Sequence, residues 1–348
     1  MTAETRFLVV GPSWVGDMVM AQSLYKLLAR RHPGAVVDVV APPWSLPILA
    51  RMPEVRRGVE LAVGHGELGL GRRFALGRRL RGQRYDRAIV LPRSLKSALV
   101  PWFAAVPVRT GFLGESRYGL INDVRPFDPA VLDQTVKRFV ALGTERGEAP
   151  GDVEPPALRA SAEAVAALRS KLGLGNAAET IALMPGAEYG PAKQWPIERF
   201  AAVAGTLAAA GLDVWVLGSA KERPLGETIA AAAPQVRNLC GATSLEDAVD
   251  LLSAARVAVT NDSGLMHVAA AVGTHVVAIY GSSSPAFTPP LTPRKTVLYL
   301  GIECSPCFQR TCPLQHLRCL RDISARSVAD AVTAALDAPQ RADGGTEA

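Results

Sequence analysis

The feature that most constrains the fold of this chain is an alternation of short apolar runs with segments of helical periodicity. Each strand-like run precedes a segment whose apolar residues recur every three or four positions. The strand-like runs occupy residues 6–11, 35–42 and 85–92 in the first half and 180–186, 213–219, 257–262 and 275–281 in the second half. Strands that alternate with helices in this way predict parallel sheets covered by helices.

Residues 144–160 separate the two sets of elements. This segment is rich in proline and acidic residues and shows neither period, which is typical of a linker. We therefore predict an α/β chain of two doubly wound, Rossmann-like domains, residues 1–150 and 151–340, the second with a Cys-rich loop at 304–319. Ligands bind at the carboxyl ends of parallel strands, so the cleft between two such domains is the expected site.

The composition is that of a soluble globular protein, with 49% apolar and 20% charged residues. No apolar stretch is long enough to span a bilayer, and the start "MTAETR" precedes only four apolar residues, so we expect no signal peptide and a cytoplasmic protein. Residues 1–150 hold 22 Lys and Arg against 13 Asp and Glu, a net charge of +9, whereas the remainder has a net charge of −3. Seven arginines lie between Arg72 and Arg87. They form either a solvated helix face or a surface for phosphates, nucleic acid or an anionic membrane.

The segment "VTNDSGLMHVAAA", residues 259–271, predicts an anion site. A strand ends at Asp262, and Ser263 and Gly264 open a helix whose free N–H groups and dipole attract negative charge. The alternative is that Asp262 or Ser263 only caps this helix and that His267 is an ordinary core residue.

Two further loops in the second half follow predicted strands. In "MPGAEYGPAKQWP", residues 184–196, small residues such as Gly186 and Ala187 leave the backbone exposed, and Lys193 is either a point charge for a phosphate or a surface lysine near a cap. In "LGSAKE", residues 217–222, Glu222 can accept hydrogen bonds from sugar hydroxyls. Three such loops in one domain predict a nucleotide-diphosphate site.

The first loop, "GPSWVGDMVM", lacks the glycine spacing of a dinucleotide site. Asp17 stands where a helix should begin, so it is either a structural cap or an ionised base that takes a proton from an attacking hydroxyl.

Four cysteines lie within sixteen residues, with His316 nearby. This grouping predicts either a structural zinc site or reduced thiols in a loop, and a cytoplasmic location argues against disulfides. The four are Cys304, Cys307, Cys312 and Cys319.

Several blocks of the sequence together resemble one known family. They are "GPSWVGDMVMAQSLY", "ARMPEV", "GHGEL", "YDRAIVLPRSLKSALVPWFA", "RTGFLGESRYGLINDVR", "PGAEYGPAKQWP", "TNDSGLMHVAAA" and "VAIYGSSSPAFTPPL". Over roughly residues 6–325 the chain resembles the heptosyltransferases of glycosyltransferase family 9, and its first loop and residues 109–125 resemble the members that add the second core heptose. The resemblance implies the GT-B fold, in which two domains face each other across a cleft.

The resemblance also implies a reaction, the inverting transfer of L-glycero-D-manno-heptose from ADP-heptose to the first heptose of the lipopolysaccharide inner core, with no catalytic metal. Asp17 matches the acid proposed as general base, and Lys193 matches the lysine that holds the donor phosphates. The implied partners are ADP-heptose, heptosyl-Kdo2-lipid A and the cytoplasmic face of the inner membrane, without nucleic acid.

The other site residues follow from the matched motifs. Donor-binding candidates are Gly186, Ala187, Lys193, Ser219, Glu222, Asp262, Ser263, Gly264, Leu265, Met266 and His267. Acceptor-binding candidates are Ser13, Trp14, Lys96, Arg109 and Arg117. Glu222 is the looser match, because its loop varies among members, and the resemblance attaches no role to the Cys-rich loop.

Three competing interpretations remain at this point. The chain could be a family 9 heptosyltransferase that acts at a different core position, or a non-transferase nucleotide-sugar enzyme such as an epimerase. The pI of 9.2 and the Cys-rich loop also raise a nucleic-acid-binding protein, although the basic excess and the cysteines lie in opposite halves and aromatic residues make up only 6%.

Overall fold

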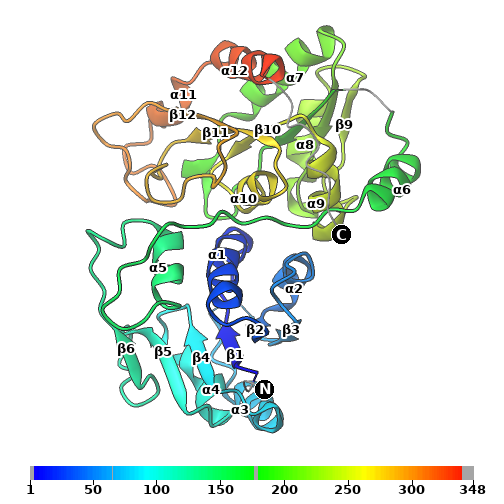
Figure 1. Ribbon diagram of the computed structural model, residues 1–348. Helices are drawn as coiled ribbons and strands as arrows, with labels where there is room; N and C mark the ends of the chain where they lie inside the picture. Colours follow the sequence, from blue (N-terminus) through cyan, green and yellow to red (C-terminus); the bar gives the residue numbers. More distant parts are fainter. Residues whose placement is uncertain (1–3, 65, 176–178, 339–348) are drawn as a thin grey trace. The chain divides into compact units, whose positions relative to one another are not determined.

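The computed structural model describes residues 4–64, 66–175 and 179–338, and the chain divides into two compact units, drawn with the sequence colours in Figure 1. Unit 1 comprises Met1–Ala160 and Ala286–Leu291, and unit 2 comprises Ser161–Pro285 and Thr292–Ala348. The units divide later than the predicted residue 150 because the intervening segment is hydrogen-bonded to the first helix: Gln22 Nε2 donates to the Ala157 carbonyl at 2.9 Å. Residues 339 and 340 of the predicted second domain lie outside the described ranges.

Unit 1 is built on a parallel six-stranded sheet of order β3-β2-β1-β4-β5-β6. Its strands are β1 (Arg6–Val10), β2 (Val36–Ala41), β3 (Arg57–Glu60), β4 (Arg87–Val90), β5 (Val108–Phe112) and β6 (Asp123–Arg125). Its helices are α1 (Val15–Arg31), α2 (Leu46–Leu49), α3 (Leu70–Leu80), α4 (Leu99–Phe103) and α5 (Thr135–Ala141), with 3₁₀ turns η1 (Pro43–Ser45), η2 (Arg81–Gln83) and η3 (Leu95–Ala98). The strand order reverses between β1 and β4, the topological switch point of a doubly wound sheet.

Helices cover both faces of this sheet because successive strand residues point to opposite sides. Leu8 and Val40 of the strands share one buried cluster with Leu76 of α3 and Val100 of α4. Helices α1 and α5 pack together and lie on the other side of the sheet (Figure 1).

Unit 2 repeats the architecture, with a parallel six-stranded sheet of order β12-β11-β10-β7-β8-β9. Its strands are β7 (Thr180–Met184), β8 (Asp213–Val216), β9 (Val236–Asn238), β10 (Val257–Asn261), β11 (His275–Tyr280) and β12 (Lys295–Tyr299). Its helices are α6 (Ala162–Leu172), α7 (Ile197–Ala209), α8 (Arg223–Ala230), α9 (Leu245–Ala254), α10 (Gly264–Ala271), α11 (Arg318–Arg321) and α12 (Ala325–Asp337), with 3₁₀ turns η4 (Pro191–Lys193) and η5 (Ala220–Glu222). Counted along the chain, the strand order is the same as in unit 1, and the switch point lies between β7 and β10.

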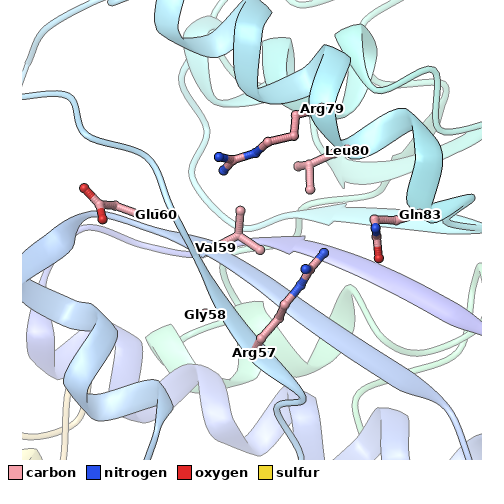
Figure 2. Close-up of a pocket in the computed structure, with 7 residues that line it drawn as sticks. All are labelled: Arg57, Gly58, Val59, Glu60, Arg79, Leu80 and Gln83. Atoms are coloured by element: carbon pink, nitrogen blue, oxygen red, sulfur yellow. The ribbon is translucent and has the colours of Figure 1, made fainter.

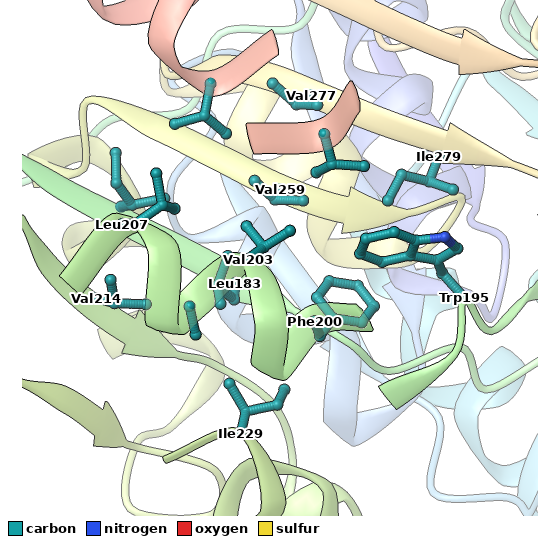
Figure 3. Packing of buried hydrophobic residues seen from close by; sticks show 14 of the residues in the cluster. Leu183, Trp195, Phe200, Val203, Leu207, Val214, Ile229, Val259, Val277 and Ile279 are labelled. Carbon is teal, nitrogen blue, oxygen red and sulfur yellow. The ribbon is translucent and has the colours of Figure 1, made fainter. Parts of the chain in front are cut away.

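The main core of unit 2 lies between its sheet and α7, α8 and α12. Figure 3 shows Phe200 and Val203 of α7 over Leu183 and Val259 of the strands. Trp195 closes one end of this core: its ring lies 5.0 Å from that of Phe200, and its Nε1 donates to the Ile323 carbonyl at 3.1 Å. A fully buried indole therefore anchors the loop that follows β7.

The predicted elements are mostly present, and the differences have physical reasons. A capping box of Ser244 and Asp247 opens α9. Pro101 does not break α4, because it lies in the first turn of this helix, where its missing N–H costs no hydrogen bond. Helix α6 and strands β6 and β12 were not predicted: α6 buries only Leu168, β6 has three residues, and β12 has no fully buried residue. Among the described residues, no helix has the length and hydrophobicity needed to cross a membrane.

A buried carboxylate in β2 ties the edge of the unit 1 sheet together. Asp38 is fully buried, and it accepts hydrogen bonds from Arg56 Nε at 2.8 Å, from Arg57 Nε at 3.0 Å and from the Tyr85 hydroxyl. Burial raises the pKa of Asp38, but these hydrogen bonds and the two guanidinium charges outweigh it, so the pKa lies below its ordinary value. Asp38 is therefore an ionised link between β2, β3 and the start of β4.

We expect Asp38→Ala to lower the free energy of unfolding by about 3 kcal/mol, because it removes the buried acceptor that the Tyr85 hydroxyl and the two arginines share, and a hydrogen bond to a charged group contributes about 1.5–3 kcal/mol. Chemical denaturation of the full chain measures the change. Glu60→Gln, at an exposed position of β3, is the matched control and should change it by less than about 0.5 kcal/mol. Equal stability of the two variants would contradict this role for Asp38.

Candidate functional site

Lys193 and Asp262, two of the predicted donor residues, form an ion pair at the switch point of unit 2. Lys193 ends η4 after β7, and Asp262 follows β10 directly. Lys193 Nζ donates to Asp262 Oδ2 at 2.6 Å, and the two side chains are only 17% and 5% exposed. Partial burial reduces screening by water, so the pair holds the ammonium group at a fixed position.

Asn261 fixes the two loops that carry this ion pair. Its Oδ1 accepts from the backbone N–H of Trp195 at 3.0 Å, and its Nδ2 donates to the Pro185 carbonyl at 2.7 Å. The residue is fully buried. Sequence reasoning did not single it out, although it stands beside Asp262 in the same motif.

The start of α10 offers backbone N–H groups rather than side chains. Ser263 occupies the N-cap position, yet its side chain makes no capping hydrogen bond, and the Asp262 carboxylate is directed to Lys193 instead. The side chains of Met266 and His267 are buried, so these two residues can meet an anion only through their backbone. Gly264 and Leu265 are partly exposed at the first turn. The predicted anion site thus consists of the N–H groups of this turn.

The structure brings Glu222, Ser219 and Gly186 together. Glu222 Oε2 accepts from both the backbone N–H and the hydroxyl of Ser219, each at 2.6 Å, which closes a capping box. A Cβ atom at Gly186 would lie 2.5 Å from Glu222 Oε1. Ala187 beside it is buried. The predicted loops after β7 and β8 therefore touch, and Gly186 allows their approach.

In unit 1, the predicted first loop occupies the corresponding place after β1. Trp14 is the N-cap residue of α1, with a side chain 39% exposed, and Asp17 lies in the first turn. Asp17 is partly buried and sits at the third helical position, so it is not the N-cap residue. The Ser13 carbonyl accepts from Trp44 Nε1 at 2.8 Å.

The three basic acceptor candidates differ in their surroundings. Lys96 is partly exposed in η3, after β4, and its Nζ donates to the Glu67 carbonyl at 3.3 Å. Arg109 donates to the carbonyls of Val106, Leu120 and Gly119, and burial lowers its pKa.

Arg117 is fully buried and donates to the Phe112 and Pro92 carbonyls. Burial, together with the nearby charge of Arg93, lowers its pKa to about 10. The guanidinium groups of Arg109 and Arg117 thus hold the loop around residues 109–125 from within unit 1.

The four clustered thiols line one small cavity of about 40 Å³ in unit 2, together with His316, Ala192 and Ser282. Cys304 Sγ lies 4.0 Å from His316 Nε2. Burial raises the pKa of Cys319, and the other three thiols raise it further. Within the described ranges, no group of three or more His, Cys, Asp or Glu residues could hold a metal ion. Zinc in this loop therefore stays a prediction, to be checked by metal analysis of the purified protein.

A pocket in unit 1 holds none of the predicted site residues. It has a volume of about 390 Å³ and lies along β3 at the sheet edge. Figure 2 shows Arg57 and Arg79 directed into it from β3 and α3. Arg57 is already bonded to Asp38, so the pocket offers one uncommitted guanidinium group and no catalytic pair.

The buried imidazole ring of His267 should make the stability of the protein depend on pH. Burial lowers its pKa to about 4, with Asp262 opposing and Lys193 adding to the shift. Between pH 6.5 and 4 the unfolded chain binds a proton that the folded chain does not, so stability should fall as pH falls, by on the order of 3 kcal/mol. We expect His267→Gln to lose this part of the slope in denaturation curves, with the pH 8 stability as reference. An unchanged slope would contradict it.

Comparison with known proteins identifies the family of this chain. The pattern described as glycosyltransferase family 9 (heptosyltransferase) matches residues 73–318. Lipopolysaccharide heptosyltransferase 2 of Escherichia coli (strain K12) is 47% identical, over 85% of this chain and 88% of the relative. Lipooligosaccharide heptosyltransferase 2 of Haemophilus influenzae is 45% identical, over 84% and 88%. The solved structure of E. coli ADP-heptose lps heptosyltransferase II superposes with a TM-score of 0.86 at 43% identity, over 95% of this chain and 98% of that one. These matches confirm the predicted family and fold class: the chain belongs to the glycosyltransferases of family 9, the heptosyltransferases.

Proposed function

We propose that the chain transfers L-glycero-D-manno-heptose from ADP-heptose to the first heptose of the lipopolysaccharide inner core. The observation that carries this proposal is the 45–47% identity to heptosyltransferase 2 relatives over most of both chains. The related solved structure is that of an ADP-heptose lps heptosyltransferase, and the E. coli relative is a lipopolysaccharide heptosyltransferase, which supports these classes of donor and acceptor.

In this proposal unit 2 binds the donor. The Lys193 ammonium and the N–H groups that open α10 flank the loops after β7 and β10, where a diphosphate would lie. Negative charge grows on the departing ADP as the glycosidic bond breaks. A cation already held in place by Asp262 stabilises that charge without rearrangement, which is the electrostatic contribution expected of a preorganised site. Glu222 is the proposed acceptor for ribose hydroxyls.

Asp17 is the proposed base. The acceptor hydroxyl attacks the anomeric carbon of the heptose, its proton passes to the Asp17 carboxylate, and the bonding electrons of the anomeric C–O bond leave with ADP. One such displacement inverts the anomeric centre. The first turn of α1 favours negative charge at Asp17. Ser13, Trp14 and Lys96 are the proposed acceptor contacts, and Arg109 and Arg117 support them by fixing the adjoining loop.

We expect Asp17→Asn to lower turnover at least about 100-fold while ADP affinity changes little, because a base contributes about 10²–10⁴ in rate and does not bind the nucleotide. Lys193→Ala should instead weaken ADP binding as well. A heptose-transfer assay and calorimetry with ADP measure the two effects. Near-normal turnover of Asp17→Asn would leave Asp17 as a structural residue only.

The same assay tests the acceptor. Core acceptors that carry no, one or two heptoses should be used in parallel, and only the one-heptose acceptor should give rapid transfer. A preference for another acceptor would indicate a family 9 enzyme of a different core position. Product formation without any acceptor would indicate a nucleotide-sugar enzyme such as an epimerase.

We also propose that unit 1 rests on the cytoplasmic face of the inner membrane through the α3–α4 patch. Its members are Leu70, Phe74 and Trp102, with Arg78 and Arg81. Leu70, Phe74 and Trp102 are 52%, 47% and 47% exposed. The Phe103 ring joins two of them, at 5.1 Å from Phe74 and 5.0 Å from Trp102.

The charge of this patch selects an anionic surface. No acidic residue occurs between Glu67 and Asp86 in the sequence, and Arg78 Cζ lies 5.9 Å from the Phe74 ring centroid. Aromatic rings beside arginine side chains suit a lipid headgroup layer, where each basic residue contributes about 1 kcal/mol. Binding at the membrane surface would bring the enzyme close to a lipid-linked acceptor.

We expect the protein to sediment with phosphatidylglycerol vesicles and much less with pure phosphatidylcholine vesicles. Arg78→Gln/Arg81→Gln should weaken binding roughly 30-fold, and Phe74→Ser/Trp102→Ser at least about tenfold. Val131→Ser, at an apolar position 48% exposed ahead of α5, is the control and should bind normally. Binding that ignores lipid charge, or that the patch variants leave unchanged, would refute this proposal without touching the transfer reaction.

A further inference from the structure

The Cys-rich loop at 304–319 packs directly on the loop that carries Lys193. The backbone N–H of Ala192 donates to the Arg310 carbonyl at 3.0 Å, and the Tyr189 hydroxyl donates to the Phe308 carbonyl at 2.7 Å. A Cβ atom at Gly190 would lie 2.5 Å from the Arg310 carbonyl oxygen, so only glycine permits this approach. The two loops are therefore in backbone contact inside unit 2.

Two cations share one aromatic ring at this contact. Lys193 Nζ lies 5.0 Å from the centroid of the Tyr189 ring, and Arg310 Cζ lies 5.2 Å from it. Both distances are in the range of cation–π attraction. The Tyr189 ring thus keeps two positive groups in one neighbourhood, although like charges would otherwise move apart.

The charge of this neighbourhood is not balanced. Lys193 has Asp262 as its counter-ion. Arg310 is exposed, and no ion pair within the described ranges of the chain includes it. One positive charge is left over beside the proposed phosphate site, and a diphosphate carries the negative charges that would compensate it.

We propose that Arg310 is a second cation for the donor diphosphate. The inference rests on the proposed function and adds to it a binding residue that comes from the Cys-rich loop. A guanidinium group presents a planar fork of donors that matches two phosphate oxygens, whereas the Lys193 ammonium is a point charge. The two groups act together: Lys193 fixes the position of the leaving group, and Arg310 takes up charge as it departs.

The remaining contacts explain how the loop holds Arg310. The Phe308 N–H donates to the Ser282 carbonyl at 2.7 Å, and the Ser305 hydroxyl donates to the Gly281 carbonyl, so the loop is attached just after β11. Behind it, the thiols pack with Ala192 and Ser282 around their small cavity. The Cys-rich loop thus positions Arg310 at the carboxyl edge of the sheet.

The test is ADP binding by calorimetry with the full-length protein. Arg310→Ala should weaken ADP binding about 10- to 100-fold, the range for a lost hydrogen bond to a charged group, and Arg310→Lys should recover part of it. Arg318→Ala is the matched control, because Arg318 belongs to the same segment, is 66% exposed and pairs with Asp322. It should bind ADP normally. Lys193→Ala serves as the positive control.

Two results would overturn the inference: unchanged ADP affinity in Arg310→Ala, or equal losses in Arg310→Ala and Arg318→Ala. If Arg310→Ala does not fold, Arg310→Gln and Arg310→Lys decide, since a graded loss from Arg to Lys to Gln follows charge. Failure of the unaltered protein to bind ADP would refute the proposed function along with this inference. Normal ADP binding and heptose transfer that do not depend on Arg310 would refute the inference alone.

Discussion

The ion pair between Lys193 and Asp262 is the interaction on which the candidate donor site depends. It joins the ends of β7 and β10, the neighbouring strands between which the order of the unit 2 sheet reverses. Helices leave such a switch point on opposite faces, so the loops there diverge and leave room for a ligand. Without a link, each loop would be free to move. Asn261 adds a second, buried link between the same loops, which makes the position of Lys193 a property of the sheet rather than of one flexible side chain.

The two units have the same strand order, but the loops at their switch points carry different residues. In unit 1 the loops at the switch point carry Asp17 after β1 and Lys96 after β4, and the glycine spacing of a phosphate loop is missing there. In unit 2 the corresponding loops carry Lys193 and the open turn of α10. In the proposed function, a general base and the cations that hold a diphosphate have opposite electrostatic requirements, because a carboxylate beside Lys193 pairs with the ammonium group, as Asp262 does. Two sheets with the same strand order allow the proposed base and the proposed cations to occupy different units.

The sequence predicts features that depend on neighbouring residues better than features that depend on contacts between distant segments. Long apolar runs and capping motifs predicted the main strands and helices, since burial and local hydrogen bonds decide those. Strand β12 was missed because it is an edge strand with partly exposed residues, and α6 because it buries a single leucine. The motif residues could be named, but not their surroundings: Arg117 was an acceptor candidate, whereas in the structure it is buried and donates to the carbonyls of Phe112 and of Pro92, 25 residues earlier. Contacts between distant segments, such as Tyr189 with Arg310, leave no local periodicity to detect.

The glycines of the candidate donor loops have a packing role that the sequence alone does not reveal. Gly186 was interpreted as backbone left bare for a phosphate, but a side chain there would collide with Glu222, and one at Gly190 would collide with the Arg310 carbonyl. Both glycines thus allow other loops of unit 2 to approach, from β8 in one case and from the Cys-rich loop in the other. A loop that binds phosphate must also be rigid, and the absence of Cβ atoms at Gly186 and Gly190 lets the neighbouring loops pack closely against it. In the proposed function the phosphate contacts fall to groups whose positions these packed loops determine, the Lys193 ammonium and the N–H groups of α10.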